Sequence, residues 1–363
     1  MKIGIVTIVD YSNYGNRLQN YAMYYILKKF FKCKAITLTI NKEMPFSNGN
    51  YLLWIKSQIV KRICYFPEYA EKRFGTIVTR WANFLSWNRK IPTKVIYNSQ
   101  QLPPILNNEF DFFIAGSDQI WNYKFAYRRF NDYFLQFADR NKRVAVSASF
   151  GVDKIEDEWE KRYIDLLTSF AHISVREDAG KKIVKDLIGK EVPVLIDPVM
   201  MLNKSEWLKV SKKPRVNISN PYVLKYYLGD EKEEDKIDIW ARKNGYEVYE
   251  LLNKEIPELY SAGPGEFISL ISNANLICSD SFHCIAFSII FAKPFIVYSR
   301  IGSEDYMTSR LDTLLNKFGF EDRWIDMLPE SKYLNCDYSN ITALMKKEQA
   351  IFIQYLSHVL KNE

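Results

Sequence analysis

Hydrophobic and polar residues alternate in two patterns along the first two hundred positions of this chain. Short runs rich in β-branched and aromatic residues predict strands, and segments with apolar residues three or four positions apart predict helices. The predicted strands cover residues 2–8, 34–40, 110–117, 143–149, 172–177 and 192–198. The predicted helices cover residues 16–30, 155–170 and 178–188. Because strands and helices follow one another in turn, we expect a parallel sheet covered by helices on both faces.

A polar and basic stretch at residues 203–220 interrupts this pattern, and we interpret it as a linker. Beyond it the alternation resumes, with predicted strands at 222–229, 246–251, 275–280 and 294–299 and predicted helices at 234–245, 266–273 and 283–291. Apolar residues at helical spacing predict a long amphipathic helix at residues 340–361, packed back across both halves. The sequence therefore predicts an α/β fold with two facing Rossmann-like domains, residues 1–205 and 206–335, a deep cleft between them, and a C-terminal helix within residues 336–363.

The balance of charge points to anionic partners without naming one. The 50 lysine and arginine residues exceed the 43 acidic residues, which gives a net charge of +7 and a pI near 8.9. Phosphorylated metabolites, anionic lipids and nucleic acid all suit such a charge. The sequence contains no long basic arm, helix-turn-helix, zinc finger or aromatic RNA-binding pattern, so we expect no nucleic-acid partner.

Cysteine and histidine usage favours a reduced, metal-free, cytoplasmic protein. The five cysteines are scattered without C-x-x-C spacing, and no histidine or acidic cluster has the spacing of metal ligands. No run approaches the roughly 20 apolar residues needed to cross a bilayer. Residues 50–66 mix aromatic residues with lysine and arginine. Two interpretations of that segment stay open: a peripheral helix on the inner face of the membrane, or a helix packed in the core.

Four short stretches combine a strand end or a helix start with residues that are able to do chemistry. The first, DYSNYGNRLQNYA at residues 10–22, contains Asn13, Gly15 and Asn16. Gly15 permits a tight turn, Asn16 is a candidate helix cap, and backbone amides at such a turn favour anions. The stretch lacks the G-x-G-x-x-G pattern, so an Asx turn with a helix cap accounts for it equally well.

The second stretch, IAGSDQIWN at residues 114–122, runs from a buried strand into Ser117 and Asp118. A polar cluster at the end of an apolar run is typical of a binding site at the carboxyl edge of a sheet. The same two residues are also able to cap the next helix, so both interpretations stay open. Trp121 suits either sugar stacking or the core, and we assign it to the core.

The third stretch is ISVREDAG at residues 173–180, in which Arg176 ends a buried strand. A buried guanidinium without a partner is too costly to keep, so it needs either a carboxylate or an anionic ligand. Glu177 and Asp178 are the candidate carboxylates in the sequence. We favour an anionic ligand for Arg176.

The fourth stretch is CSDSFHCIAFSIIFAKPF at residues 278–295, in which a polar turn precedes a very apolar helix. It places His283 at the rim of the expected crevice, where an imidazole is suited to general acid catalysis. Asp280 is the nearest carboxylate in the sequence and is expected to orient that imidazole. Arg300 and Arg310 follow and are candidates to hold phosphate. The alternatives are a structural histidine and surface ion pairs.

In this order, the stretches resemble the polysaccharide pyruvyl transferase family. The resemblance rests on NYGNRLQNYAM, FFIAGSDQIWN, ISVREDAG, VLIDPVMML, ICSDSFHCIAFSIIFAKPF and SRLDTLL, and it covers residues 1–323. One departure is Cys284, where many members have glycine, so the backbone there approaches a ligand less closely. The resemblance implies two lobes arranged as in GT-B glycosyltransferases. It also implies transfer of the pyruvyl group of phosphoenolpyruvate to a sugar of a cell-surface polysaccharide or its lipid-linked precursor, as a ketal.

The resemblance also implies roles for single residues. The residues that would hold phosphoenolpyruvate are Arg176, Arg310, Arg300 and Ser281. The residues that would bind the acceptor or a phosphate are Asn13, Gly15, Asn16 and Ser117. His283 would protonate the donor or hold its phosphate, and Asp118 would accept the proton of the sugar. The first domain would form the acceptor side and the second the phosphoenolpyruvate side, with no cofactor and no metal.

Two other functions fit the same features. A glycosyltransferase that uses a nucleotide sugar would have the same two-lobe plan. A non-catalytic sugar-binding relative would keep the fold without turnover. The acceptor sugar and the oligomeric state stay open at this point.

Overall fold

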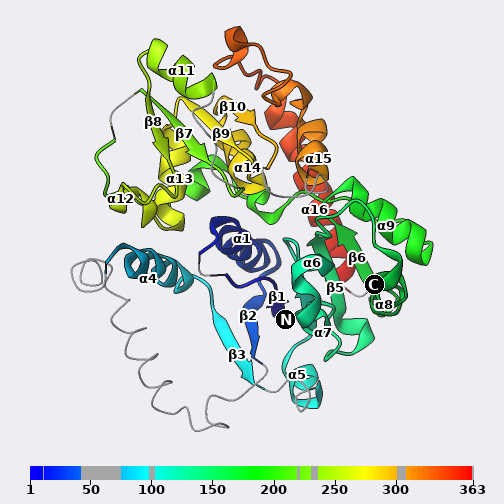
Figure 1. Ribbon diagram of the computed structural model, residues 1–363. Coiled ribbons are helices and arrows are strands. Elements are labelled where there is room, and N and C mark those ends of the chain that lie inside the picture. The colour runs from blue at the N-terminus through cyan, green and yellow to red at the C-terminus, as the bar shows by residue number, and fades with distance from the viewer. Residues whose placement is uncertain are drawn as a thin grey trace.

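The computed structural model describes residues 1–10, 12–41, 75–97, 103–218, 221–229, 236–300 and 308–361. The segment at residues 50–66, for which two interpretations were open, lies outside the described residues. Two parallel sheets, each flanked by helices, form the two lobes of the molecule (Figure 1). This confirms the predicted α/β fold of two Rossmann-like units.

The first lobe is built on six strands in the order β3-β2-β1-β4-β5-β6, and every neighbouring pair is parallel. The strands are β1 (Lys2–Val6), β2 (Lys34–Asn41), β3 (Thr93–Tyr97), β4 (Phe112–Ala115), β5 (Arg143–Ala148) and β6 (His172–Val175). The chain adds strands first on one side of β1 and then on the other. The carboxyl ends of β1 and β4 therefore border a crevice, which is where open α/β sheets bind ligands.

The second lobe repeats this plan with four parallel strands in the order β10-β9-β7-β8. The strands are β7 (Tyr222–Tyr226), β8 (Glu247–Glu250), β9 (Leu276–Ser279) and β10 (Phe295–Val297). Here the order reverses between β7 and β9. The segments after these two strands, residues 227–229 and 280–281, thus lie at a second crevice of the same kind.

The described helices connect and cover these strands, together with the 3₁₀ turn η4 (Pro198–Met201). In the first lobe they are α1 (Tyr14–Phe31), α4 (Thr76–Asn88), α5 (Pro103–Glu109), α6 (Tyr123–Ala126), α7 (Phe130–Tyr133), α8 (Asp157–Leu167) and α9 (Asp178–Ile188). Beyond it they are α10 (Lys204–Leu208), α11 (Lys236–Lys243), α12 (Pro257–Tyr260), α13 (Pro264–Asn273), α14 (Phe282–Phe291), α15 (Ser309–Phe318) and α16 (Ile341–Lys361). The helices predicted from periodicity are all present, with ends that differ by a few residues.

Helix α1 lies between the two lobes, as Figure 1 shows, and contacts α13 and α14 as well as its own sheet. Every residue from Tyr14 to Met23 is buried, which a helix on the surface of a sheet would not show. Leu18 of α1, Phe267 of α13 and Phe287 of α14 belong to one continuous hydrophobic cluster. The two lobes therefore share this cluster, and each also has a further cluster of its own.

The C-terminal helix α16 packs across both lobes, as predicted. Its Tyr355 hydroxyl donates a 2.9 Å hydrogen bond to the carbonyl of Ala145 in β5, and Glu348 forms a 2.8 Å ion pair with Lys317 of α15. Phe352 and Leu356 are fully buried on the same helix. Among the described residues, no helix is both long and apolar enough to cross a membrane.

Three sequence predictions need correction. Residues 192–198 do not form a strand. Proline at 193 has no N–H to donate, and only an isolated bridge joins Val194 to Val175. The stretch at 203–220 is more than a linker, because it contains α10 and the fully buried Trp207. Strand β3, at the edge of the first sheet, was not predicted.

Candidate functional site

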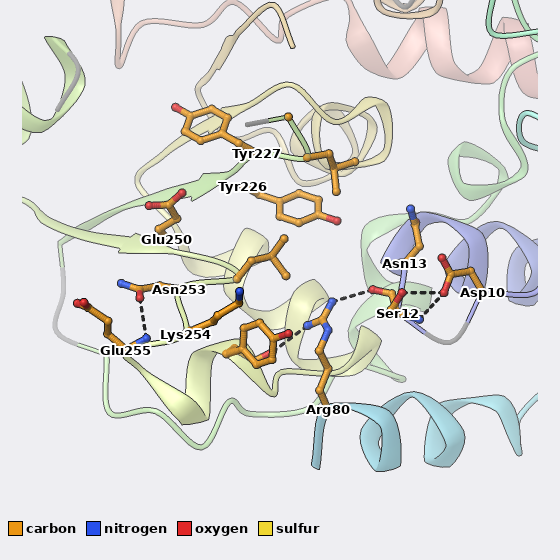
Figure 2. Close-up of a pocket in the computed structure, with 14 residues that line it drawn as sticks. Asp10, Ser12, Asn13, Arg80, Tyr226, Tyr227, Glu250, Asn253, Lys254 and Glu255 are labelled. Carbon is orange, nitrogen blue, oxygen red and sulfur yellow. Dashed lines mark hydrogen bonds between the residues drawn. The ribbon is translucent and has the colours of Figure 1, made fainter. Parts of the chain in front are cut away.

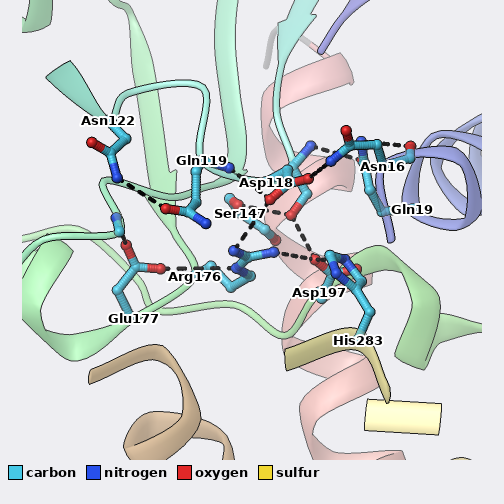
Figure 3. A network of polar contacts seen from close by, with 12 residues as sticks. Asn16, Gln19, Asp118, Gln119, Asn122, Ser147, Arg176, Glu177, Asp197 and His283 are labelled. Carbon is cyan, nitrogen blue, oxygen red and sulfur yellow. Dashed lines mark hydrogen bonds and ion pairs between the residues drawn. The ribbon is translucent and has the colours of Figure 1, made fainter. Parts of the chain in front are cut away.

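Polar side chains from both lobes meet at the carboxyl edges of the sheets, as Figure 3 shows. We call this group the polar network; its members are Asn16, Ser117, Asp118, Arg176, Glu177, Asp197 and His283. Six of these residues come from the first lobe, and His283 comes from α14 of the second. All seven are buried.

Asp197 is the centre of the polar network. Its Oδ2 atom accepts 2.8 Å hydrogen bonds from Arg176 Nη1 and Ser117 Oγ and lies 3.5 Å from His283 Nε2. Its Oδ1 atom accepts a 3.0 Å hydrogen bond from the backbone of Val199. Burial raises the pKa of Asp197, but His283, Arg176 and the backbone hydrogen bond outweigh burial and hold the pKa well below its ordinary value. The ionised carboxylate therefore links the two lobes.

Arg176 is a buried cation surrounded by carboxylates. Besides Asp197, it lies 3.7 Å from an oxygen of Asp118 and 3.8 Å from an oxygen of Glu177. Burial lowers the pKa of Arg176, but these three carboxylates more than offset burial, so the pKa is raised overall. The ring of Phe282 lies 4.3 Å from the guanidinium carbon. The chief partner is thus Asp197, which the sequence analysis did not consider.

His283 packs against the first turn of α1. A Cβ atom built on Gly15 would lie 2.1 Å from His283 Nδ1, so only glycine allows this approach. The sequence analysis assigned Gly15 to a tight turn, but in the structure Gly15 lies in the first turn of α1 and makes room for the imidazole. The helix cap is Asn13, whose side chain accepts the backbone N–H of Asn16 at 3.2 Å. Asn16, the predicted cap, instead donates its side-chain amide to Asp118.

The predicted partner of His283, Asp280, does not contact the imidazole in the structure. Its two oxygens accept backbone hydrogen bonds from Leu228 and Gly229, at 2.8 and 2.9 Å. Arg300 Nε also lies 3.5 Å from Asp280. Asp280 thus shapes the segment after β7, and the carboxylate that faces His283 belongs to Asp197.

Arg310, in the first turn of α15, is a buried cation of a different kind. It is 6% exposed, and no hydrogen bond or ion pair joins its guanidinium to another described residue. Burial lowers the pKa of Arg310 to about 9, and the charges of Arg176 and Arg300 act in the same direction. Glu177 and Asp118 act in the opposite direction, but neither carboxylate forms an ion pair or a hydrogen bond with Arg310.

Two serines of the predicted site are also internal to the protein. The hydroxyl of Ser117 contacts both Asp197 and the carbonyl of Ser147 and is fully buried. Ser281 occupies the cap position of α14 and donates its backbone N–H to the Ser279 hydroxyl at 3.0 Å. Trp121 is fully buried and stacks on Phe134, which confirms its assignment to the core.

A cleft of about 780 Å³ opens between the lobes (Figure 2). One wall is formed by the segment after β1, which includes Asp10 and Asn13, and the other by the ends of β7 and β8. Arg80 of α4 joins the walls, because it donates 2.7 and 2.8 Å hydrogen bonds to the carbonyls of Ser12 and Tyr260. Of the predicted site residues, Asn13 lines this cleft, and the others do not.

A family model described as polysaccharide pyruvyl transferase matches residues 13–301. The chain belongs to the polysaccharide pyruvyl transferase family. It is therefore a transferase of polysaccharide biosynthesis. The match includes all of the polar network and the described residues of the cleft except Asp10 and Ser12. No curated protein shows significant similarity to this transferase.

Solved structures similar to the transferase include HepE from Anabaena in complex with UDP and glucose, at 10% identity and a TM-score of 0.47, with 100% of both chains covered. A glycosyltransferase from Rickettsia africae has 11% identity and a TM-score of 0.46, with 100% of this chain and 99% of that chain covered. UDP-GlcNAc 2-epimerase from Neisseria meningitidis has 12% identity and a TM-score of 0.45, with 98% and 99% covered. At these values the likeness has no bearing on the reaction of the transferase.

The contact between Gly15 and His283 gives the first prediction. Gly15→Ala should lower the free energy of unfolding by about 1 to 3 kcal/mol, because the added methyl group displaces the imidazole. In a His283→Ala background the collision is absent, and the same change should become neutral or stabilising, since alanine is the better helix former. Urea denaturation of the four proteins measures both effects. An equal loss in both backgrounds would contradict the contact.

Asp197 gives a prediction about pH. Asp197→Asn should lower the free energy of unfolding by about 3 to 5 kcal/mol at pH 7, because it leaves a buried cation without its partner. The folded-state pKa of Asp197 is lowered, so its stabilising effect is present above the unfolded pKa of about 4 and is lost as pH falls below it. Urea denaturation from pH 3 to 8 should show the difference from wild type shrink only below about pH 4. Asp186→Asn, on the exposed side of α9, is the control, and a pH-independent difference would refute the assignment.

Proposed function

We propose that this transferase moves the pyruvyl group of phosphoenolpyruvate to a sugar, as a cyclic ketal, and releases phosphate. The observation that carries the proposal is Arg310, a buried guanidinium that forms no hydrogen bond and no ion pair with another described residue. A buried charge in this state is costly, and an anionic ligand would remove the cost. Phosphoenolpyruvate is a small, densely charged anion and suits such a site.

The surroundings of Arg310 support the same ligand. Arg176 and Arg300 lie close enough to Arg310 to repel its charge, and the carboxylates of Glu177 and Asp118 offset part of that repulsion. The N-terminus of α14, which begins at Phe282, adds backbone N–H groups and the positive end of a helix dipole. Arg176 belongs to the first lobe and pairs with Asp197, whereas Arg300 belongs to the second lobe and lies beside Asp280. A donor bound among these arginines would therefore contact both lobes, rather than the second domain alone.

The chemistry requires one acid and at least one base. A proton added to the methylene carbon of phosphoenolpyruvate leaves the adjacent carbon cationic. The oxygen of a sugar hydroxyl then bonds to that carbon and gives up its proton. Attack by a second hydroxyl of the same sugar breaks the bond between that carbon and the phosphate oxygen. Phosphate leaves, the second hydroxyl loses its proton, and the ketal ring closes.

His283 and Asp118 are the residues that we propose for these proton transfers. The imidazole of His283 faces the carboxylate of Asp197 through Nε2, at 3.5 Å. Asp118 accepts hydrogen bonds from the Asn16 side chain and the Gln119 backbone, so its carboxylate is held in one orientation. A fixed carboxylate is suited to accept the proton of an attacking hydroxyl.

The reaction itself provides a direct test. Purified protein would be incubated with phosphoenolpyruvate and one sugar at a time from a panel of nitrophenyl and lipid-linked sugars. A control incubation would contain phosphoenolpyruvate and no sugar. We expect phosphate release that depends on a sugar, and a product sugar that has gained a pyruvate ketal by mass spectrometry. Parallel incubations would contain nucleotide sugars instead. Release of a nucleoside diphosphate, or sugar binding without turnover of either donor, would overturn the proposal in favour of a glycosyltransferase or a non-catalytic relative.

Arg310 gives a prediction that separates ligand binding from a structural role. Arg310→Met should raise the Michaelis constant for phosphoenolpyruvate by about tenfold to a hundredfold, as expected for the loss of charged hydrogen bonds. The free energy of unfolding should stay unchanged or rise, because an apolar side chain replaces an unpartnered buried cation. Arg162→Met, on the exposed face of α8, is the matched control. Marked destabilisation with a normal Michaelis constant would show that Arg310 is structural.

A further inference from the structure

The cleft between the lobes is lined by a tyrosine whose hydroxyl has no hydrogen-bond partner among the described residues. Tyr226 ends β7 and is 2% exposed, with its ring packed against Tyr14 and Phe267 at centroid distances of 5.6 Å. Among the described residues, none forms a hydrogen bond with its hydroxyl, which points into the cleft toward Ser12 and Asn13 (Figure 2). Burial raises the pKa of Tyr226 well above its ordinary value, so the hydroxyl stays protonated and able to donate. A hydroxyl in this position is able to donate a hydrogen bond to a ligand in the cleft.

The opposite wall offers a matching acceptor. Both hydrogen bonds from Ser12, through its backbone and its hydroxyl, reach the same oxygen of Asp10, at 2.7 Å each. No described residue donates to the second oxygen of Asp10. The cleft is therefore bordered on one side by a phenol that donates and on the other by a carboxylate that accepts, which is the arrangement that holds the hydroxyls of a sugar ring.

The charges along the cleft disfavour an anionic ligand. Asp10, Glu250 and Glu255 contribute three carboxylates, against the two cations Arg80 and Lys254. Arg80 also has little capacity left to hold a phosphate, because its guanidinium donates to three backbone carbonyls and a tyrosine hydroxyl. The cleft thus has more carboxylates than cations, and its one arginine is already bound to the protein.

We propose that the acceptor binds in this cleft as an uncharged sugar ring, with its hydroxyls hydrogen-bonded to Tyr226 and Asp10. This rests on the proposed function, and it adds the chemical class of the acceptor and the residues that select it. The diphosphate of a lipid-linked acceptor lies outside the cleft. Of the residues predicted to bind the acceptor, Asn13 is the one that belongs to this site, since Gly15, Asn16 and Ser117 are part of the polar network.

The first test is equilibrium binding without donor. Titration calorimetry would compare methyl glycosides of glucose, galactose and mannose with methyl glucuronide and methyl galacturonide. We expect one or more neutral glycosides to bind, and the uronide of the same sugar to bind at least about tenfold more weakly at low salt, with a smaller difference at high salt. Asp10→Asn should reduce this discrimination, because it removes one repelling charge. Uronides that bind as tightly as the neutral sugars would overturn the proposal.

The second test removes only the phenolic hydroxyl. Tyr226→Phe should weaken binding of the neutral glycoside by about threefold to tenfold, as expected for one hydrogen bond. The Michaelis constant for phosphoenolpyruvate and the urea midpoint should stay unchanged, because the hydroxyl has no protein partner to lose. Tyr24→Phe, on a partly exposed position of α1 outside the cleft, is the matched control. Unchanged glycoside binding in Tyr226→Phe would overturn the proposal.

These measurements keep the two proposals apart. A protein that binds neutral glycosides through Tyr226 but releases no phosphate from phosphoenolpyruvate would support the cleft and reject the proposed reaction. A protein that releases phosphate with a sugar, yet has wild-type sugar affinity after Tyr226→Phe, would support the reaction and reject the cleft.

Discussion

The buried carboxylate of Asp197 is the contact on which the arrangement of this site depends. It neutralises Arg176 from the first lobe and faces His283 from the second, and it is itself fixed by the backbone of Val199. Charges interact strongly in such a water-poor interior, and unpaired charges are correspondingly costly. The position of the imidazole is thus set by electrostatics across the lobe boundary, and by the close packing of Gly15 against it.

The two crevices at the carboxyl ends of the sheets meet at the boundary between the lobes. Parallel sheets whose strand order reverses place loops side by side at their carboxyl ends, and both lobes do this at the same boundary. One part of that boundary holds Arg176, Arg300 and Arg310 among buried carboxylates, and the neighbouring cleft is lined by carboxylates and tyrosines. In the proposed reaction, the charged donor and the neutral acceptor would bind in these two neighbouring parts of the boundary.

The sequence was informative where the signal is local. Alternation of apolar and polar residues located most strands and helices, and polar residues at the ends of apolar runs located Ser117, Asp118, Arg176 and His283. It was not informative about partners, because these come from segments far apart in the chain. Asp197 follows the apolar run VLI just as Asp118 follows IAGS, so the same signal was present there but was not used. By contrast, no local pattern shows that Gly15 makes room for an imidazole. Nor does a local pattern show that Trp207 is buried in the core rather than exposed in a linker.

The central helix α1 limits how the molecule can be divided. One side of α1 packs on the first sheet and the other on α13 and α14, so its apolar surface is complete only when both lobes are present. A fragment made of either half alone would expose a large hydrophobic surface to water and would tend to aggregate. For the same reason, wide opening of the lobes would expose the hydrophobic cluster that they share. The two Rossmann-like units are thus joined through the packing of a single helix.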